Sequence, residues 1–397
     1  MTKITDIPAI RFKGFSDTWE QRKLGEIGSV SMCRRIFKEQ TSENGEIPFY
    51  KIGTFGGEAD AFISRELFEE YKAKYQYPKK GDILISASGS IGRTVVFTGK
   101  NEYFQDSNIV WLNHDKHLDN SFLKCFYSIV KWAGIEGSTI KRLYNDNILN
   151  TAITLPSVEE QQKIGAYFEN LDNLITLHQR KYDKLTNVKK SMLEKMFPQN
   201  GSNVPEIRFK GFTEAWEQRK AIDIADYSKG NGYSKGDLTD AGTPIILYGR
   251  LYTKYQFAIS EVDTFAVPRN GAVYSQGNEV IVPASGETAE DIARASAVEK
   301  SGVLLGGDLN ILRPFDFINP LFLALAISNG EPQKELAKKA QGKSVVHIHN
   351  TDIQEVTIAY PSRTEQDRIV SVFRQLDNLI TLHQRKPNFY TGGYYAE

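Results

Sequence analysis

The sequence predicts an α+β protein in which two strand-rich α/β modules are separated by two long antiparallel coiled-coil helices with pseudo-two-fold symmetry. Three observations predict this architecture: a length of 397 residues, which is typical of two to three domains; a duplication of two sequence blocks; and an apolar repeat at coiled-coil spacing after each module. The predicted segments are 1–155 (module 1), 156–199 (first helix), 200–360 (module 2) and 361–397 (second helix with a shortened, non-helical tail).

The duplication consists of two blocks that each occur twice. IRFKGFSDTWEQRK at Ile10–Lys23 recurs as IRFKGFTEAWEQRK at Ile207–Lys220, with eleven of fourteen residues identical. LPSVEEQQKIGAYFENLDNLITLHQRK at Leu155–Lys181 recurs as YPSRTEQDRIVSVFRQLDNLITLHQRK at Tyr360–Lys386. A repeat of this length marks two copies of one structural unit. Because the interiors between the blocks diverge, we expect one fold with two different surfaces.

Strands are predicted where short β-branched or aromatic runs are bounded by Gly, Asn and Pro. These runs are Asp82–Ser86, Arg93–Thr98, Ile109–Leu112, Val280–Val282 and Val303–Leu305. Some helix is mixed in, so each interior is expected to be a mixed, strand-rich globular module.

A long helix is predicted after each module. Ser157–Glu160 and Ser362–Glu365 both read S-x-x-E after a proline, which is the pattern of a helix-starting capping box. Apolar residues that then alternate by four and three indicate a coiled-coil seam. The seam residues are Ile164, Phe168, Leu171, Ile175 and His178 in the first helix and Ile369, Phe373, Leu376, Ile380 and His383 in the second. The two histidines share one seam position, where a polar residue is expected to fix the register.

The second helix is expected to end early, because Pro387 and the pair Gly392–Gly393 follow the repeat where the first helix continues. Part of the apolar seam of the first helix then lacks its partner. Self-association of the chain through this incomplete helix pair is one expectation, and cover by the aromatic residues of the tail is another.

The sequence does not match known patterns of catalytic, metal-binding or cofactor-binding sites. Gly342-Lys343-Ser344 lacks the earlier glycine of a phosphate-binding loop, since position 337 is Ala337, and the six histidines form no metal-ligand pattern. Cys33 and Cys125 are too few for a disulfide framework and are expected to be reduced. We therefore predict no catalytic residue, no metal and no cofactor. Without a long apolar run or a signal pattern, we also predict no membrane span and a cytoplasmic location.

Nucleic-acid binding must rest on local clusters, because 49 Lys and Arg residues balance 49 Asp and Glu residues. Two loops that begin with glycine, Gly137–Arg142 and Gly342–His347, precede the final strand and helix of each module and carry Ser, Thr and cationic side chains. Such loops can approach a phosphate backbone and base edges, although each cluster taken alone also fits a solvated surface. The candidate residues are Arg34, Arg35, Lys79, Lys80, Ser86, Ser88, Lys141, Arg142, Lys338, Lys339, Lys343, Ser344 and His347.

The repeated RFKGF-[ST]-[DE]-x-W-E block, the GDILIS-like strand, the glycine loop and the P-S-x-x-E-Q ending resemble the specificity subunit of type I restriction-modification systems over nearly the whole chain. The resemblance implies that the modules are two target-recognition domains, each reading one half of a bipartite double-stranded DNA sequence. It also implies that the helices set the half-site spacing and dock two methyltransferase (modification) subunits, which restriction (translocase) subunits join. Catalysis would then come from these partners, and a methyltransferase subunit becomes a third candidate to cover the incomplete seam. The rival hypothesis is a two-module coiled-coil scaffold that binds proteins rather than DNA.

Overall fold

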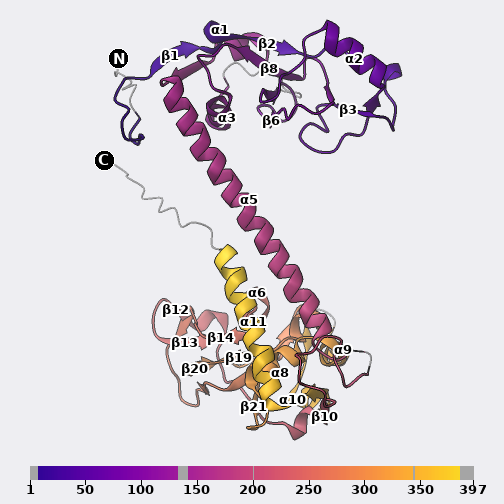
Figure 1. The fold of residues 1–397 in the computed structure, drawn as a ribbon. Helices are drawn as coiled ribbons and strands as arrows, with labels where there is room; N and C mark the ends of the chain where they lie inside the picture. Colours follow the sequence, from indigo (N-terminus) through magenta and orange to yellow (C-terminus); the bar gives the residue numbers. More distant parts are fainter. Residues whose placement is uncertain (1–7, 133–141, 200, 343–344, 385–397) are drawn as a thin grey trace. The chain divides into compact units, whose positions relative to one another are not determined.

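The computed structural model describes residues 8–132, 142–199, 201–342 and 345–384 and divides the chain into two compact units, Met1–Thr176 (unit 1) and Leu177–Glu397 (unit 2). Helix α5 (Val158–Lys195) is continuous over 38 residues and contributes to both units, as Figure 1 shows. Because the unit boundary falls inside α5, the four predicted segments remain a prediction. Within the described part of the chain, no helix is both long and apolar enough to span a membrane.

The described part of unit 1 contains a four-stranded sheet of order β2-β8-β5-β6 and a three-stranded sheet of order β4-β3-β7. The strands are β2 Gly28–Met32, β3 Ile47–Tyr50, β4 Phe62–Ile63, β5 Ile83–Ser86, β6 Thr94–Val96, β7 Tyr103–Phe104 and β8 Ile109–His114. The helices are α1 Leu24–Ile27, α2 Arg65–Lys74, α3 Asn120–Ile129 and α4 Asn145–Leu149. Strand β1 (Glu20–Lys23) pairs antiparallel with β9 (Ala152–Leu155), which joins the two ends of module 1.

Strand β5 is central because both of its faces are buried. Ile83 and Ile85 contribute to one apolar core, whereas Leu84 contributes to another. Since successive side chains of a strand lie on opposite faces, the sheet separates these two cores. This explains the uninterrupted apolar run of the sequence at this strand.

Unit 2 repeats this topology with additional strands. In its described residues the sheet orders are β11-β21-β17-β19-β14 and β12-β15-β13-β20-β16, and β10 (Glu217–Lys220) pairs with β23 (Thr357–Tyr360) as β1 pairs with β9. The remaining strands are β11 Ala225–Lys229, β12 Leu238–Thr239, β13 Thr243–Ile246, β14 Ala258–Ile259, β15 Phe265–Ala266, β16 Tyr274–Gln276, β17 Glu279–Pro283, β18 Ser285–Gly286, β19 Ser296–Val298, β20 Ser301–Leu305, β21 Leu309–Pro314 and β22 Val346–His347. The helices are α6 Arg250–Thr253, α7 Ala289–Ile292, α8 Pro320–Ile327, α9 Gly330–Lys339, α10 Asn350–Gln354 and α11 Arg363–Gln384. Each predicted run overlaps one of the observed strands β5, β6, β8, β17 and β20.

The two repeated sequence blocks meet in a buried ion pair. Arg11 of the first block donates from Nε and Nη2 to the two carboxylate oxygens of Glu160, at 2.7 Å each. Arg208 contacts Glu365 in the same bidentate way, at 2.7 and 2.8 Å. Hydrogen bonding to these carboxylates raises the pKa of both guanidinium groups. A buried carboxylate is stable when it is paired in this manner. The pair therefore anchors each module to the start of its helix.

This pairing replaces half of the predicted capping box. The Ser157 hydroxyl accepts from the Glu160 amide at 3.4 Å, as a capping serine does, but the Glu160 carboxylate contacts Arg11 instead of returning to the helix start. In the second copy, the Glu365 amide donates to the Ser362 carbonyl at 3.0 Å. A bidentate bond to a cation is stronger than a neutral amide contact, so the arginine takes the carboxylate.

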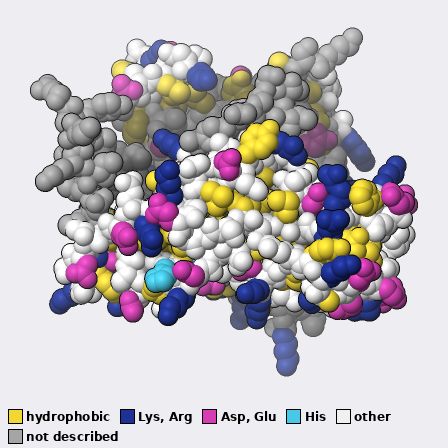
Figure 2. Space-filling model, turned by 90° about the horizontal axis from the view of Figure 1, so that it is seen from above, with side chains coloured by type: hydrophobic (Ala, Val, Ile, Leu, Met, Phe, Trp, Pro, Cys, Tyr) yellow, Lys and Arg dark blue, Asp and Glu magenta, His cyan; other side chains and the backbone are white. Residues whose placement is uncertain are grey.

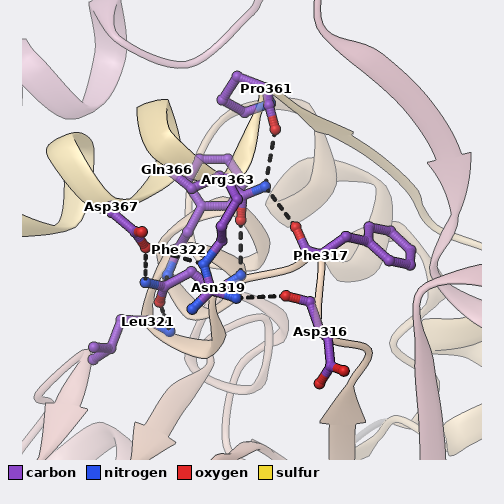
Figure 3. A network of polar contacts seen from close by, with 9 residues as sticks. All are labelled: Asp316, Phe317, Asn319, Leu321, Phe322, Pro361, Arg363, Gln366 and Asp367. Atoms are coloured by element: carbon purple, nitrogen blue, oxygen red, sulfur yellow. Dashed lines mark hydrogen bonds and ion pairs between the residues drawn. The ribbon is translucent and has the colours of Figure 1, made fainter.

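A glutamine next to each of these glutamates forms a second joint, which Figure 3 shows for unit 2. Gln366 accepts from the Asn319 amide at 2.8 Å and donates to the carbonyls of Phe317 and Pro361 at 3.1 and 2.9 Å. Its counterpart Gln161 makes the same three contacts in unit 1, with the Asp119 amide and the His117 and Pro156 carbonyls. All of these partners are backbone groups, so the joint is independent of their side chains.

The later part of α5 and helix α11 form an antiparallel pair within unit 2, as Figure 1 shows. Lys189 Nζ lies 2.5 Å from Asp377 Oδ1, and Gln384 Nε2 donates to the Tyr182 hydroxyl at 3.1 Å. The first turns of α11 are buried in the core of unit 2 through Ile369, Phe373 and Leu376. Pro387 and the rest of 385–397 lie outside the described residues.

Helix α5 contacts module 1 so closely that one glycine position is constrained. A Cβ atom at Gly165 would lie 1.8 Å from the Ser121 hydroxyl oxygen and 3.0 Å from the Ser121 carbonyl carbon. The corresponding residue of α11 is Val370, which is buried without such a conflict. Glycine lowers the helix propensity of α5 at this position but allows the backbone of α5 to approach α3 closely.

We expect Gly165→Ala to destabilise unit 1 by about 1 to 3 kcal/mol, because the overlap outweighs the roughly 1 kcal/mol that alanine gains in a helix. Hydrogen exchange of the α3 amides measures this change. Asn173→Ala, at an exposed position of the same helix, is the matched control and should leave α3 protection unchanged. If the α3 amides are more protected from exchange in Gly165→Ala than in the wild type, the contact between Gly165 and Ser121 is not tightly packed and the prediction is wrong.

Candidate nucleic-acid interface

Three segments of module 1 that are distant in sequence meet where β5 ends. The Ala87 amide donates to the Asn108 carbonyl at 2.7 Å, and the Leu143 amide donates to the Ala87 carbonyl at 2.8 Å. Ala87 and Leu143 are both buried, at 2% and 4% exposure. The backbone at this point is therefore fixed from both sides.

The side chains beside this framework form a polar group that we call the module 1 cluster: Ser88, Asn108 and Arg142. Ser88 Oγ donates to Asn108 Oδ1 at 2.8 Å, and Arg142 Nη2 donates to the same oxygen in a long hydrogen bond of 3.5 Å. Ser88 is only 6% exposed, whereas Arg142 is exposed. The serine thus positions the asparagine, and the arginine is the surface group.

Module 2 repeats the framework with different side chains. The Ala284 amide donates to the Asp308 carbonyl at 2.9 Å, and the Ile348 amide donates to the Ala284 carbonyl at 3.0 Å. Ser285 Oγ lies 3.0 Å from His347 Nδ1, in the short pairing of β18 with β22. We call Ser285, Asp308 and His347 the module 2 cluster. In this module the serine, which is 7% exposed, contacts the exposed basic side chain directly, whereas in module 1 Asn108 lies between them.

One further predicted residue of module 1 contacts the loop that carries Asn108. Arg35 donates to Asp106 at 3.0 Å, and the Asp106 carbonyl accepts from the Asn108 amide at 2.5 Å. Between them Ser107 has φ of 52°, an unusual backbone conformation for a residue other than glycine. Arg34 lies over the Tyr75 ring, 5.2 Å from its centroid.

The other predicted lysines and Ser344 are not part of the two clusters. Lys79 and Lys80 precede β5 and so lie at the end of the strand opposite Ser88. Lys338 and Lys339 end α9, where Lys339 pairs with Glu355. Lys141, Lys343 and Ser344 lie outside the described residues.

Ser86 is the predicted residue that the structure removes from the surface. It is 1% exposed and donates to the Ser90 carbonyl at 2.5 Å, because it is the last residue of the buried strand β5. Ser86 is therefore not part of the module 1 cluster, and the role in DNA binding that the sequence suggests for it stays a prediction. Asn108, Ser285 and Asp308 are the members that the sequence did not indicate, because their places depend on contacts between distant segments.

The predicted seam residues have very different surroundings in the two helices. In α11, Ile369, Phe373 and Leu376 are buried, and Ile380 and His383 are half-buried. In α5, Ile164 and Leu171 are half-buried, and Phe168, Ile175 and His178 are exposed. His178 Nδ1 and His383 Nδ1 lie 2.8 Å apart, so one ring donates and the other accepts.

The two cysteines have no features of a reactive site. Both are free, and burial raises the pKa of the Cys33 thiol to about 12. Burial also raises the pKa of Cys125. A thiol with a raised pKa is a poor nucleophile and a poor metal ligand at neutral pH. In the described residues no group of three or more His, Cys, Asp or Glu side chains is arranged to hold a metal ion.

Charges are mixed over the face shown in Figure 2. Lys and Arg side chains are interspersed there with Asp and Glu side chains, in keeping with the zero net charge of the sequence. Any contact with nucleic acid on such a face depends on a few placed groups rather than on a broad basic field.

Two stretches of the chain, residues 16–187 and 213–389, match the family model described as the type I restriction modification DNA specificity domain. These stretches comprise most of the sequence and coincide with the two repeats. The chain belongs to this family.

Two relatives agree with this assignment, and a solved structure has a similar fold. A putative type I restriction enzyme specificity subunit of Haemophilus influenzae is 60% identical over 158 residues, which is 39% of this chain and 41% of that protein. The specificity subunit of the type I restriction enzyme MjaVIII of Methanocaldococcus jannaschii is 22% identical over 77% of this chain and 72% of its own length. The crystal structure of a type I restriction-modification S subunit from M. genitalium has the same fold, with a TM-score of 0.52 at 15% identity over 96% of this chain and 93% of that chain.

Proposed function

We propose that this chain recognises a bipartite double-stranded DNA sequence, with one half-site read by module 1 (1–155) and the other by module 2 (200–360). The observation that carries the proposal is the pair of strand-end clusters. Both have the same backbone framework and an exposed basic residue paired through the backbone with a buried serine, but the basic residue is Arg142 in one and His347 in the other. Different donors on one scaffold are suited to different bases.

The proposal assigns the chemistry of modification and cleavage to partner subunits. A chain of zero net charge releases few counterions on DNA, so we expect it to bind DNA weakly alone and to depend on partners for much of its affinity. In this account two methyltransferase subunits dock on the helices, restriction (translocase) subunits join them, and the chain itself has no catalytic residue, cofactor or metal.

The exposed apolar residues of α5 support a docking role for this helix. Phe168 is 49% exposed, Leu174 50% and Ile175 67%, on a helix whose other end is buried in unit 2. Exposed apolar side chains that gather on one element are typical of a protein interface. The rival hypothesis, a scaffold that binds only proteins, accounts for this surface but not for the two matched clusters.

Selection from random duplex DNA tests the proposal. The full chain, assembled with its modification subunits, is expected to enrich two conserved clusters of bases separated by a spacer of fixed length. Assembly is checked separately by size-exclusion chromatography. If the complex assembles and no sequence is enriched, the DNA-recognition proposal is wrong and the scaffold hypothesis is favoured.

A further inference from the structure

Arg142 is held in place by its neighbours along the chain. It forms an isolated antiparallel bridge with Ser88, and the next residue, Leu143, is buried and bonded to the Ala87 carbonyl. The backbone of Arg142 is thus fixed beside the end of the central strand. The Arg142 side chain is exposed, but the Cα atom from which it extends has a fixed position.

Most N–H donors of the Arg142 guanidinium have no partner among the described residues. A guanidinium carries five N–H groups, and among the described residues only one contact of Arg142 is present, from Nη2 to Asn108 Oδ1. That oxygen is itself held by Ser88 Oγ at 2.8 Å. The asparagine therefore contacts the guanidinium at one nitrogen without neutralising its charge.

Some other arginines of module 1 differ in this respect, whereas Arg34, over the Tyr75 ring, and Arg93, bonded to the Phe55 carbonyl, also form no ion pair among the described residues. Arg11 is paired with Glu160 and Arg35 with Asp106. Arg142 has no carboxylate partner in the part of the chain that the structure describes. A guanidinium without a carboxylate partner among the described residues is suited to a planar acceptor pair, and the O6 and N7 atoms of guanine in the major groove form such a pair.

A comparison of the two modules favours a base contact over a phosphate contact. The phosphate backbone is the same in every half-site, so a residue that only contacts phosphate has no reason to differ between the modules. At this position of the shared framework, however, the side chain changes from Arg142 to His347. A change of this kind is expected where bases are read.

We propose that Arg142 reads a guanine in the half-site of module 1 through a bidentate contact, with Asn108 and Ser88 as positioning residues. This inference rests on the proposed function and adds the identity of one base to it. Recognition by module 1 then depends on a guanine in its half-site. Module 2 has His347 at the equivalent position and therefore has a different base preference.

The test compares selected DNA sequences for the wild type, Arg142→Ala and Arg142→Lys, each as the full chain assembled with its modification subunits. The half-site of module 1 is the one that changes when residues 24–154 are replaced. We expect both variants to lose the preference for guanine at one position of that half-site, with affinity for the guanine-containing site lowered about 10- to 100-fold in Arg142→Ala. Lysine retains the charge but cannot form the bidentate contact, so it should not restore the preference.

Two controls separate the possible results. Arg65→Ala, which removes an exposed arginine of helix α2 that is paired with Glu46, should retain the preference for guanine. The half-site of module 2 should be unchanged in all variants, which also shows that they fold. If Arg142→Ala weakens binding equally for all sequences and Arg142→Lys restores it, Arg142 contacts phosphate and the inference is wrong. If the wild type selects no sequence at all, the proposed function itself fails.

Discussion

Replacing Phe373 with alanine will destabilise unit 2 by about 3 to 5 kcal/mol, whereas the same change at its repeat counterpart Phe168 will cost less than about 1 kcal/mol. The two residues occupy equivalent positions in nearly identical helical sequences. Phe373 is 0% exposed and Phe168 is 49% exposed. Removing a buried ring loses its transfer free energy and leaves a cavity, but removing an exposed ring does neither to the same extent.

The packing around the two rings explains the size of this difference. Phe373 lies in the large apolar core of unit 2 and contacts the Phe197 ring, with centroids 6.3 Å apart. Phe197 in turn stacks on Phe322. The described ring contact of Phe168 is with its neighbour Tyr167, at 5.6 Å. The core of unit 2 therefore depends on Phe373, and no comparable core depends on Phe168.

Hydrogen exchange of the full chain measures both variants. Phe373→Ala should lower the protection of the α8 amides in unit 2 and leave β5 in unit 1 unchanged, and Phe168→Ala should leave both unchanged. Equal loss of protection in the two variants would contradict the packing described for α11 and α5.

The main elements of the fold could be predicted from local sequence patterns. The apolar run of β5 and β8 and the S-x-x-E starts of the two helices are signals within a few residues, and the structure contains these elements. The duplication predicted that the modules share one fold, and the equivalent sheet orders confirm it. Periodicity and repeats predict these elements because both can be recognised in the sequence without knowledge of contacts between distant residues.

Features that depend on distant contacts could not be predicted. The pairing of Arg11 with Glu160 joins residues 149 positions apart, and both also fit local roles. Ser86 and Ser88 occur in the same short motif, yet one ends a buried strand and the other supports Asn108. The spacing of residues in the sequence therefore indicates neither which distant residues pair nor which of the two serines ends a buried strand.

The two helices show the same limit. The sequence LDNLITLHQRK occurs in both helices, but Leu376 of α11 is buried and its counterpart Leu171 of α5 is half-buried. Likewise Ile380 of α11 is half-buried, whereas its counterpart Ile175 of α5 is 67% exposed. Burial is set by what packs against a helix and not by its own periodicity. The repeat pattern alone therefore could not tell a buried seam from an exposed one.

A replacement of the interior of module 1, residues 24–154, by the equivalent segment of another family member should change one half-site completely and leave the other intact. The joints between module and helix explain why this large change is tolerated. Arg11 and Glu160 both lie outside the replaced segment, and Gln161 contacts it only through the backbone of His117 and Asp119. Any interior with the same backbone can satisfy these contacts.

Sequencing of the DNA selected by this chimaera, assembled with the same modification subunits, tests the central claim most directly. The account predicts that the half-site of module 2 and its orientation are retained while the half-site of module 1 becomes that of the donor protein. A chimaera that assembles and folds but changes both half-sites, or neither, would contradict independent recognition by two modules.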